Sequence, residues 1–243
     1  MTLVLLTLAG LLSLILFPVE TLISGAALPA PIWVMRLGIL IQPAILLGIA
    51  LMVGFALAPK LGLRAPAVAA FARGEQIWPI LRRQLLPASL VAALVAAILL
   101  MFHEMIVPQI AQLANPDSAS LLKIGMPPVT RLLYGGIAEE VMTRWGLVSL
   151  FGWIIWRLAG KPDTVGTATL AMAVTLSALL FALGHVPLLY AIIGSPPLEL
   201  LATVIVGNAL PGLMFGWLFV KYGLEAAMIG HMGAHALAMA LGA

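Results

Sequence analysis

The chain has no cysteine and carries very little charge. Without cysteine, disulfides, thiol catalysis and zinc or iron–sulfur sites held by Cys are excluded. Only 9% of its 243 residues are charged, against about 25% in an average soluble domain. A soluble fold with so few charges could not cover its surface, and a hydrophobic content of 63% with a mean hydropathy of +1.16 points the same way. The sequence therefore predicts an integral membrane protein with the lipid bilayer as its surroundings.

Seven apolar stretches are long enough to cross a bilayer, which takes about 20 mainly apolar residues. They lie at roughly residues 3–24, 33–58, 84–107, 128–157, 166–192, 198–221 and 224–242. The first has no positively charged start, so we expect a retained helix rather than a signal peptide. We predict an all-α fold, a polytopic transmembrane bundle of about seven membrane helices (six to eight). Residues 1–243 should form a single membrane domain, with N-terminal helices in 1–124 and a motif-bearing core in 125–243.

Charge alternates between the predicted connections. Basic residues gather on one side, namely Lys60, Arg64, Arg73, Arg82, Arg83, Arg157, Lys161 and Lys221. The opposite loops hold Glu20, Asp117, Lys123 and Glu199. Positive loops stay cytoplasmic, so we predict a cytoplasmic N-terminus and an external C-terminus in a bacterial inner (plasma) membrane. No basic patch of the nucleic-acid type is present, and no nucleic-acid partner is expected.

The polar segment between the second and third stretches does not fit a span. Residues 65–83 mix Phe71, Ile77 and Trp78 with several charges. This mixture predicts an amphipathic helix lying in the membrane interface, with an ordered cytoplasmic loop as the alternative.

A few ionisable residues fall inside the predicted spans, where a charge costs about 2.5–3.5 kcal/mol. Glu140 and Arg144 are four apart in the fourth span and can pair on one helix face. Glu139 lies about 100° further round and is left for another role. The alternative is that all three form one packing network. His185 in the fifth span and the seventh-span pair His231 and His235 complete the set.

An acid and several imidazoles at similar depth suit peptide hydrolysis. A buried glutamate can activate water, and a histidine can donate to the developing oxyanion. Other chemistries fit less well: His103-Glu104 begins a His-Glu-x-x-His zinc motif that Val107 fails to close, and Asp117 and Asp163 fall in loops. Ser195 lies in a turn without a nucleophile signature.

Zinc is the alternative by ligand type. His185, His231, His235 and a glutamate could hold the ion. No ligand pair carries a helical zinc signature by itself, so we expect no metal and no cofactor.

Three short motifs follow one another along the predicted spans: Glu139-Glu140-Val-Met-Thr-Arg144, Phe181-Ala-Leu-Gly-His185 and His231-Met-Gly-Ala-His235. The first matches Glu-Glu-x-x-x-Arg, the second matches Phe-x-x-x-His, and the third resembles a His-x-x-x-Asn/Asp motif. Their order and spacing resemble the CPBP family of intramembrane endopeptidases, which includes type II CAAX prenyl proteases and bacteriocin-processing or immunity proteins. The resemblance covers about residues 125–243, which would then be the catalytic core.

This resemblance implies a glutamate-dependent, metal-independent mechanism. Glu139 with His185 would activate water, and His231 with His235 would form the oxyanion hole. His235 departs from the asparagine common in the prenyl proteases, but a neutral imidazole can also donate a hydrogen bond. The implied substrate is a membrane-associated peptide or lipidated protein, prenylated CAAX-type proteins being the family's best-known targets.

Other residues are expected to support the site. The resemblance gives Glu140 and Arg144 the task of orienting it, and places Phe181 beside it. Asn208 and Pro211 are candidates to break the sixth helix near the cavity. In the same helix, Gly212 and Gly216 form a small-x-x-x-small pair, which favours close helix packing.

Two other functions stay open on the sequence. One is a non-catalytic bacteriocin-immunity or scaffold membrane protein of the same fold. The other is a proton-coupled transporter that uses the buried Glu and His groups as a relay. No oligomeric state is predicted.

Overall fold

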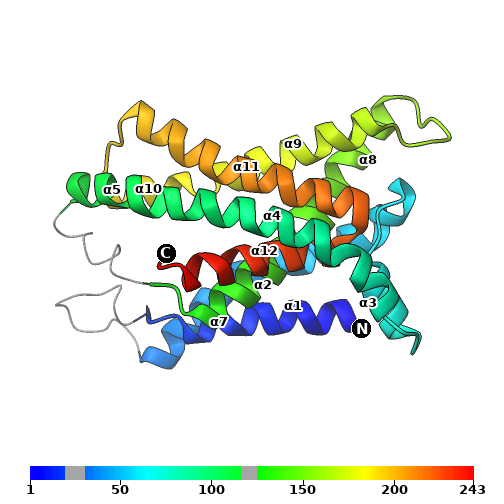
Figure 1. Ribbon diagram of the computed structural model, residues 1–243, viewed down its shortest axis with the longest axis horizontal. Coiled ribbons are helices and arrows are strands. Elements are labelled where there is room, and N and C mark those ends of the chain that lie inside the picture. Colours follow the sequence, from blue (N-terminus) through cyan, green and yellow to red (C-terminus); the bar gives the residue numbers. More distant parts are fainter. Residues whose placement is uncertain (20–30, 116–124) are drawn as a thin grey trace.

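The computed structural model describes residues 1–19, 31–115 and 125–243, and its long helices run roughly along one axis (Figure 1). In chain order the elements are α1 (Thr2–Ser13), η1 (Leu14–Leu16), α2 (Ile32–Leu57), η3 (Ala58–Leu61), α3 (Pro66–Ala72), α4 (Trp78–Met105), α5 (Val107–Leu113), α7 (Pro128–Thr130), η5 (Arg131–Glu139), η6 (Val141–Val148), α8 (Ser149–Leu158), α9 (Thr167–Leu183), α10 (Val186–Ile193), α11 (Leu198–Tyr222) and α12 (Leu224–Ala240). The predicted all-α, polytopic class is confirmed.

Four helical stretches are long and apolar enough to cross a membrane: Ile32–Leu61, Trp78–Leu113, Thr167–Ile193 and Leu198–Tyr222. Thr2–Leu16 is a shorter apolar helix. The two other predicted spans are also helical, as the course from α7 to α8 and as α12. Seven apolar helical segments therefore make up the described part of the bundle.

The first predicted span is too long. Helix ends at Leu16, and Phe17 is extended at φ −65°, ψ 130°, because the following Pro18 disfavours helical backbone in the residue before it. Residues 20–24 of that prediction, and the loop residues Glu20, Asp117 and Lys123, lie outside the described residues.

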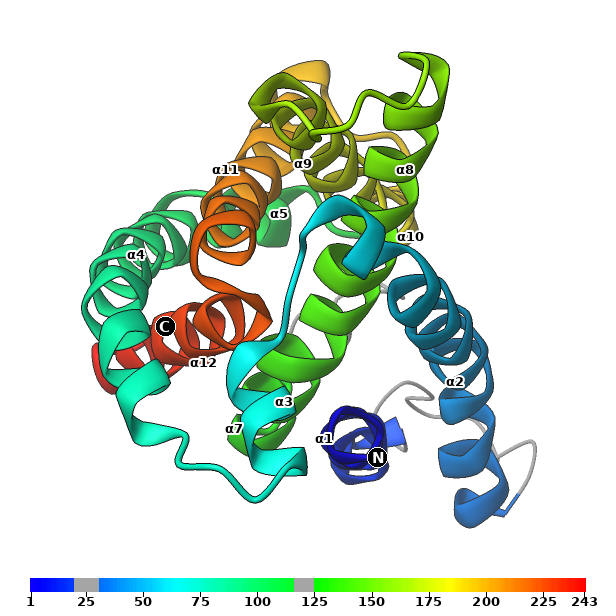
Figure 2. The same cartoon turned by 90° about the vertical axis from the view of Figure 1, so that its right-hand side faces the viewer.

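The course from residue 128 to residue 158 is the central helix of the bundle (Figure 2). Its η5 half packs against α1 and α12, and its η6 half packs against α2 and α9. Both halves are π-helical, with Glu140 at their junction. The winding is therefore π-helical rather than the regular α-helix predicted, although the contact predicted between Glu140 and Arg144 forms. π-Turns are rare and cluster at functional sites, and this helix carries the first motif.

The helices approach one another closely at glycines, which have no side chain to keep them apart. A Cβ at Gly136 would lie 2.1 Å from Met232 Cγ on α12, and one at Gly216 would lie 2.4 Å from Val174 Cγ1 on α9. At Gly212 the nearest atom would be Ala178 Cβ, at 2.9 Å. The close packing predicted for the sixth helix is confirmed, against α9.

The predicted break in that helix is wrong. α11 runs without interruption through Asn208 and Pro211. Asn208 Nδ2 donates to the carbonyl of Val204 at 2.8 Å. Such a bond to the preceding turn is compatible with a continuous helix.

The polar segment 65–83 is not one amphipathic helix. It divides into the short α3 and the first turns of α4, which cross at the right of the view in Figure 1. Gly74 stands between them at φ 73°, a left-handed conformation that glycine adopts without strain. The turn at this glycine ends α3 and redirects the chain into the bundle.

Candidate active site

A buried ion pair lies at the middle of the bundle. The side chain of Glu140 is fully buried, and its Oε2 lies 3.1 Å from Nε of Arg144, which is 2% exposed. Nη2 of Arg144 donates to the carbonyl oxygen of Gly212 on α11 at 3.0 Å, and Nη1 donates to the hydroxyl of Thr143. The pair predicted from the four-residue spacing is present. It also ties the central helix to α11.

His231 on α12 contacts the other oxygen of the same carboxylate. Its Nδ1 lies 2.8 Å from Glu140 Oε1. The ring stacks between Phe215 and His235, with centroid distances of 4.6 and 5.0 Å. Because an ionised carboxylate only accepts hydrogen bonds, Nδ1 is the donor and Nε2 is the ring nitrogen left for chemistry. Glu140 therefore sets both the tautomer and the orientation of His231.

Glu139 faces a different space from its neighbour. It lines a cavity of about 560 Å³ that α2, the central helix and the α9–α10 junction enclose. The other lining residues are mainly apolar and include Gln42, Ile49, Met142 and Phe181. Within the described chain, the Glu139 carboxylate makes neither a hydrogen bond nor an ion pair to another residue. His231, His185, Glu140 and Arg144 are near enough to act on it electrostatically.

His185 also lines that cavity, at the junction of α9 and α10. The sequence predicted it inside the fifth helix, but α9 ends at Leu183 and His185 caps α10. Pro187 at the start of α10 lacks the N–H that would continue a helix. The face shared with Phe181 nevertheless persists: His185 Nδ1 lies 3.0 Å from the carbonyl of Phe181, and the rings meet edge to face at 4.8 Å. Since a carbonyl only accepts, Nδ1 is the donor and Nε2 is free.

His235 lies close to the central helix at Gly135, where there is no side chain between them. A Cβ at Gly135 would lie 3.1 Å from Nε2 of His235 and 3.7 Å from Nε2 of His231. Both imidazoles therefore reach the backbone of the central helix at a position without a side chain. His235 does not line the cavity of Glu139. Its part in an oxyanion hole stays a prediction.

Asn208 faces a second, smaller cavity of about 230 Å³, which His185 also lines. His185 therefore lines both cavities. Asn208 does not line the cavity of Glu139, and its side-chain amide bonds within its own helix.

Thr143 is a residue that the motifs did not single out. Its hydroxyl donates to the backbone carbonyl of Glu139 at 2.5 Å and accepts from Arg144. Its own carbonyl accepts from Ser177 Oγ of α9 at 2.8 Å. This chain of contacts joins the backbone of Glu139 to the buried arginine. A threonine inside Glu-Glu-x-x-x-Arg was the available signal, but a hydroxyl in an apolar helix usually bonds its own preceding turn.

The ionisable side chains of this site do not form one compact cluster. In the part of the chain that the structure describes, no three His, Asp or Glu side chains come together as metal ligands. His103 and Glu104, the start of the incomplete zinc motif, are exposed near the end of α4. The Glu139 carboxylate and the His185 imidazole line one cavity. A second imidazole, that of His231, is held by the ion pair of Glu140 and Arg144.

Comparison with known proteins relates part of the chain to one family. No curated protein and no solved structure matches the chain significantly. Residues 125–237 match the family model described as Type II CAAX prenyl endopeptidase Rce1-like. The matched segment holds all three motifs, from the paired glutamates to His235. Over these residues the chain is therefore similar to the Rce1-like type II CAAX prenyl endopeptidases.

Proposed function

We propose that the chain hydrolyses a peptide bond in a membrane-associated peptide or lipidated protein, of the prenylated CAAX type or a related one, with water activated by Glu139 and His185. The observation that carries this proposal is the different surroundings of two adjacent glutamates. The Glu140 carboxylate is already bonded to Arg144 and His231. Glu139 faces an apolar cavity together with His185.

The reaction begins with a water between Glu139 and Nε2 of His185. One of them takes a proton from the water, and the water oxygen attacks the carbonyl carbon of the scissile peptide. Oxygen forms a bond to carbon, and the carbonyl electron pair moves onto oxygen. The C–N bond then breaks, and the proton passes to the leaving nitrogen. General acid–base catalysis of this kind contributes about 10²–10⁴-fold in rate.

In this scheme His231 stabilises the oxyanion. With Nδ1 donating to Glu140, Nε2 donates only when the ring is protonated. The Glu140 carboxylate stabilises that imidazolium at 2.8 Å. A cationic donor held in a fixed position near the developing charge would lower the barrier without reorganisation of solvent.

We also propose that the reaction needs no metal. His185 and His231 each commit one ring nitrogen to a protein acceptor, so each has one nitrogen left. In our scheme those nitrogens serve proton transfer and oxyanion stabilisation. Activity that survives dialysis against a chelator supports this, and activity restored only by added zinc contradicts it.

The test uses the full chain in lipid nanodiscs with a library of prenylated and unmodified membrane peptides, read by mass spectrometry. Glu139→Gln keeps the shape of the side chain but cannot accept a proton as a carboxylate does. We expect cleavage to fall by at least about 10²-fold. His103→Gln, an exposed position on α4, is the matched control and should cleave at the wild-type rate. Equal cleavage by wild type and Glu139→Gln would remove Glu139 from the reaction, and no cleavage by either would leave a non-catalytic membrane protein.

A further inference from the structure

One end of the bundle carries most of the basic side chains. The ends of α2, α8 and α11 and the starts of α1, α4 and α9 meet there, around α3, at the right of Figure 1. The basic residues of this end are Lys60, Arg64, Arg73, Arg82, Arg83, Arg157, Lys161 and Lys221. By the positive-inside rule this end faces the cytoplasm, where the leaflet is rich in anionic lipids.

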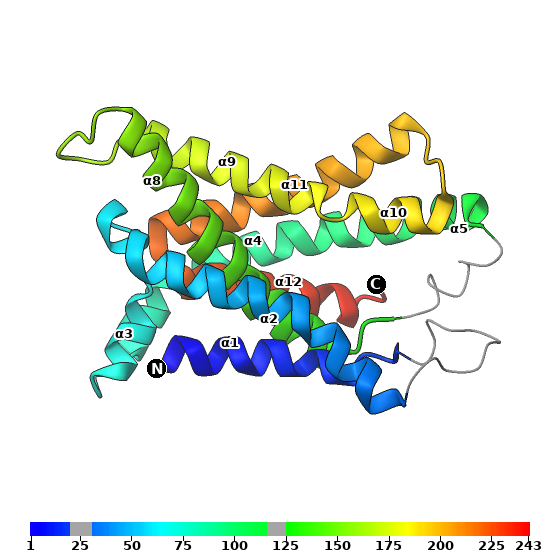
Figure 3. The ribbon, with the colours of Figure 1, turned by 180° about the vertical axis from the view of Figure 1, so that it is seen from behind.

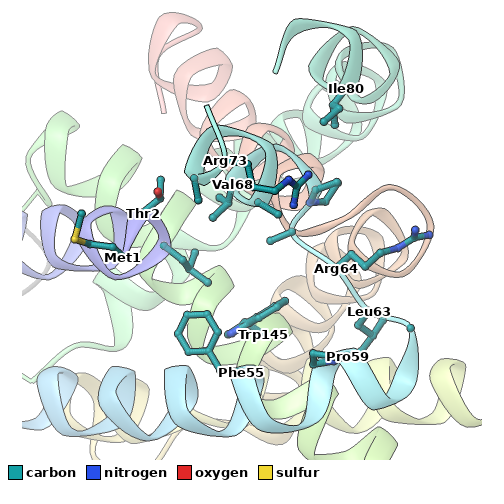
Figure 4. A pocket seen from close by; sticks show the side chains of 16 residues that line it. Met1, Thr2, Phe55, Pro59, Leu63, Arg64, Val68, Arg73, Ile80 and Trp145 are labelled. Carbon is teal, nitrogen blue, oxygen red and sulfur yellow. The ribbon is translucent and has the colours of Figure 1, made fainter. Parts of the chain in front are cut away.

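An apolar cavity of about 830 Å³ opens at this end, well separated in sequence from the motif histidines. Figure 4 shows Phe55 and Trp145 together on one wall, with Val68 and Arg73 across from them. Leu3 of α1 also contributes to the lining. Figure 3 shows from behind how α3 and the start of α1 meet at this end. The space is as large as a small-molecule pocket, which typically measures about 300–1,000 Å³.

A second cavity, of about 420 Å³, adjoins the first. The two share Gly62, Arg64, Pro66 and Ile80 as lining residues. The second is lined by three exposed basic side chains, those of Arg64, Arg83 and Lys221. Among its described lining residues there is no carboxylate.

The nearby acidic groups are already engaged. Buried Glu225 accepts from the backbone N–H of Val68 at 2.7 Å and from Gln84 at 3.5 Å. Glu75 pairs with Arg73 at 2.5 Å, and this hydrogen bond lowers the pKa of the Glu75 carboxyl. Arg73 is therefore compensated. Arg64, Arg83 and Lys221 form no ion pair within the described chain.

We propose that the two adjoining cavities bind one anionic phospholipid. Its phosphate lies beside Arg64, Arg83 and Lys221, and an acyl chain enters the apolar cavity against Trp145. A free phosphate ion would leave the larger, apolar cavity unused. A zwitterionic lipid has a phosphate too, but its own headgroup cation balances that charge, so it would not neutralise the uncompensated basic cluster. Each basic side chain near an anionic lipid surface contributes about fivefold in affinity.

The test reads the fluorescence of Trp145 in the full chain. The protein is reconstituted in phosphatidylcholine vesicles containing a small fraction of brominated phosphatidylglycerol or brominated phosphatidylcholine, since bromine quenches tryptophan on contact. Subtracting the signal of Trp145→Phe isolates this one indole from the five others. We expect half-quenching at a markedly lower fraction of phosphatidylglycerol than of phosphatidylcholine.

Matched variants separate the site from the general charge of this end. In Arg64→Gln/Arg83→Gln/Lys221→Gln the preference for phosphatidylglycerol should be lost, and each single variant should weaken it about fivefold. Arg157→Gln/Lys161→Gln removes basic residues from the same end but outside both cavities, and should keep the preference. Lipid retained by the wild type and by the triple variant, counted by native mass spectrometry, gives a second readout that does not depend on Trp145→Phe folding.

Three results would overturn the proposal. Equal quenching by the two brominated lipids would show no headgroup selection. An unchanged preference in the triple variant would place selection elsewhere. Loss of the lipid signal on adding excess inorganic phosphate would identify a site for free phosphate instead.

Discussion

Glu139 and Glu140 are neighbours in the sequence and have opposite environments. Glu140 is fully buried between Arg144 and His231, whereas Glu139 lines the cavity that His185 enters. Two adjacent residues of one helix cannot face the same direction, so the Glu-Glu pair places one carboxylate in the ion pair and the other at the cavity. Removing one partner of a buried ion pair leaves an uncompensated charge and costs about 3–5 kcal/mol.

Arg144 offers a test of the structural half of this division. We expect Arg144→Lys to lower the free energy of unfolding by about 3 kcal/mol. Lysine keeps the charge, but its single ammonium cannot reach Glu140, Gly212 and Thr143 together, and hydrogen bonds to a charged group are worth about 1.5–3 kcal/mol each. Denaturant unfolding in detergent micelles measures the difference. Arg82→Lys, exposed at the start of α4, should change the free energy by less than about 0.5 kcal/mol; similar losses in both variants would contradict the assignment.

The helices come together through glycines as much as through large side chains. α11 presents Gly212 and Gly216 to Ala178 and Val174 of α9, and the carbonyl of Gly212 then receives Arg144. Packing of α11 on α9 therefore sets the distance at which the buried arginine is held. Without a hydrophobic driving force between helices in lipid, such close van der Waals contact is a main source of association.

This packing makes Gly216→Ala a sharp test. Its added Cβ would lie 2.4 Å from Val174 Cγ1, and overpacking of this kind costs about 1–3 kcal/mol. Gly207→Ala on the same helix meets only an ordinary contact, 3.4 Å from Phe102, and should be neutral or stabilising by up to about 1 kcal/mol. Thermal unfolding of the two variants measures the contrast. Equal melting temperatures would show that the α9–α11 contact is not tight.

The sequence predicted where the helices lie better than it predicted their winding and their breaks. Apolar length marks a span whatever the neighbours are, so the helical course of all seven stretches could be predicted. The π-helical winding of residues 131–148 and the break at His185 could not, because both depend on tertiary contacts that a pattern of apolar residues does not encode. The division of residues 65–83 was missed for the opposite reason: Gly74 was a local signal, and the mixed polarity of the segment outweighed it.

The candidate site was predictable in part. Spacing alone paired Glu140 with Arg144. The contact of His231 with Glu140 needed knowledge of how α12 lies against the central helix. The contacts of Thr143 and the approach of the two imidazoles at Gly135 were missed. Neither threonine nor glycine signals chemistry by itself. Which residues carry out catalysis stays a prediction.

The distribution of charge gives the molecule two unlike ends. The end of the bundle around α3 carries most of the basic side chains, and positive loops remain cytoplasmic. We therefore propose a cytoplasmic N-terminus, an external C-terminus and a bacterial inner membrane location. The same polarity brings the proposed phospholipid cavities to the cytoplasmic leaflet.

The cysteine-free sequence makes this orientation easy to measure. Single cysteines replace Lys161, in the connection between α8 and α9, and Leu241, after α12. With a membrane-impermeant maleimide, we expect Leu241→Cys to react in spheroplasts and Lys161→Cys to react only after permeabilisation. The reverse pattern would invert the topology.

The most direct measurement compares Glu139→Gln with Glu140→Gln for two quantities, peptide turnover and the free energy of unfolding. If the two carboxylates divide their tasks, Glu139→Gln should lose at least about 10²-fold in turnover and unfold within about 0.5 kcal/mol of wild type. Glu140→Gln should lose about 3–5 kcal/mol of stability. A Glu139→Gln variant that cleaves normally, or one that is the less stable of the two, would contradict the division.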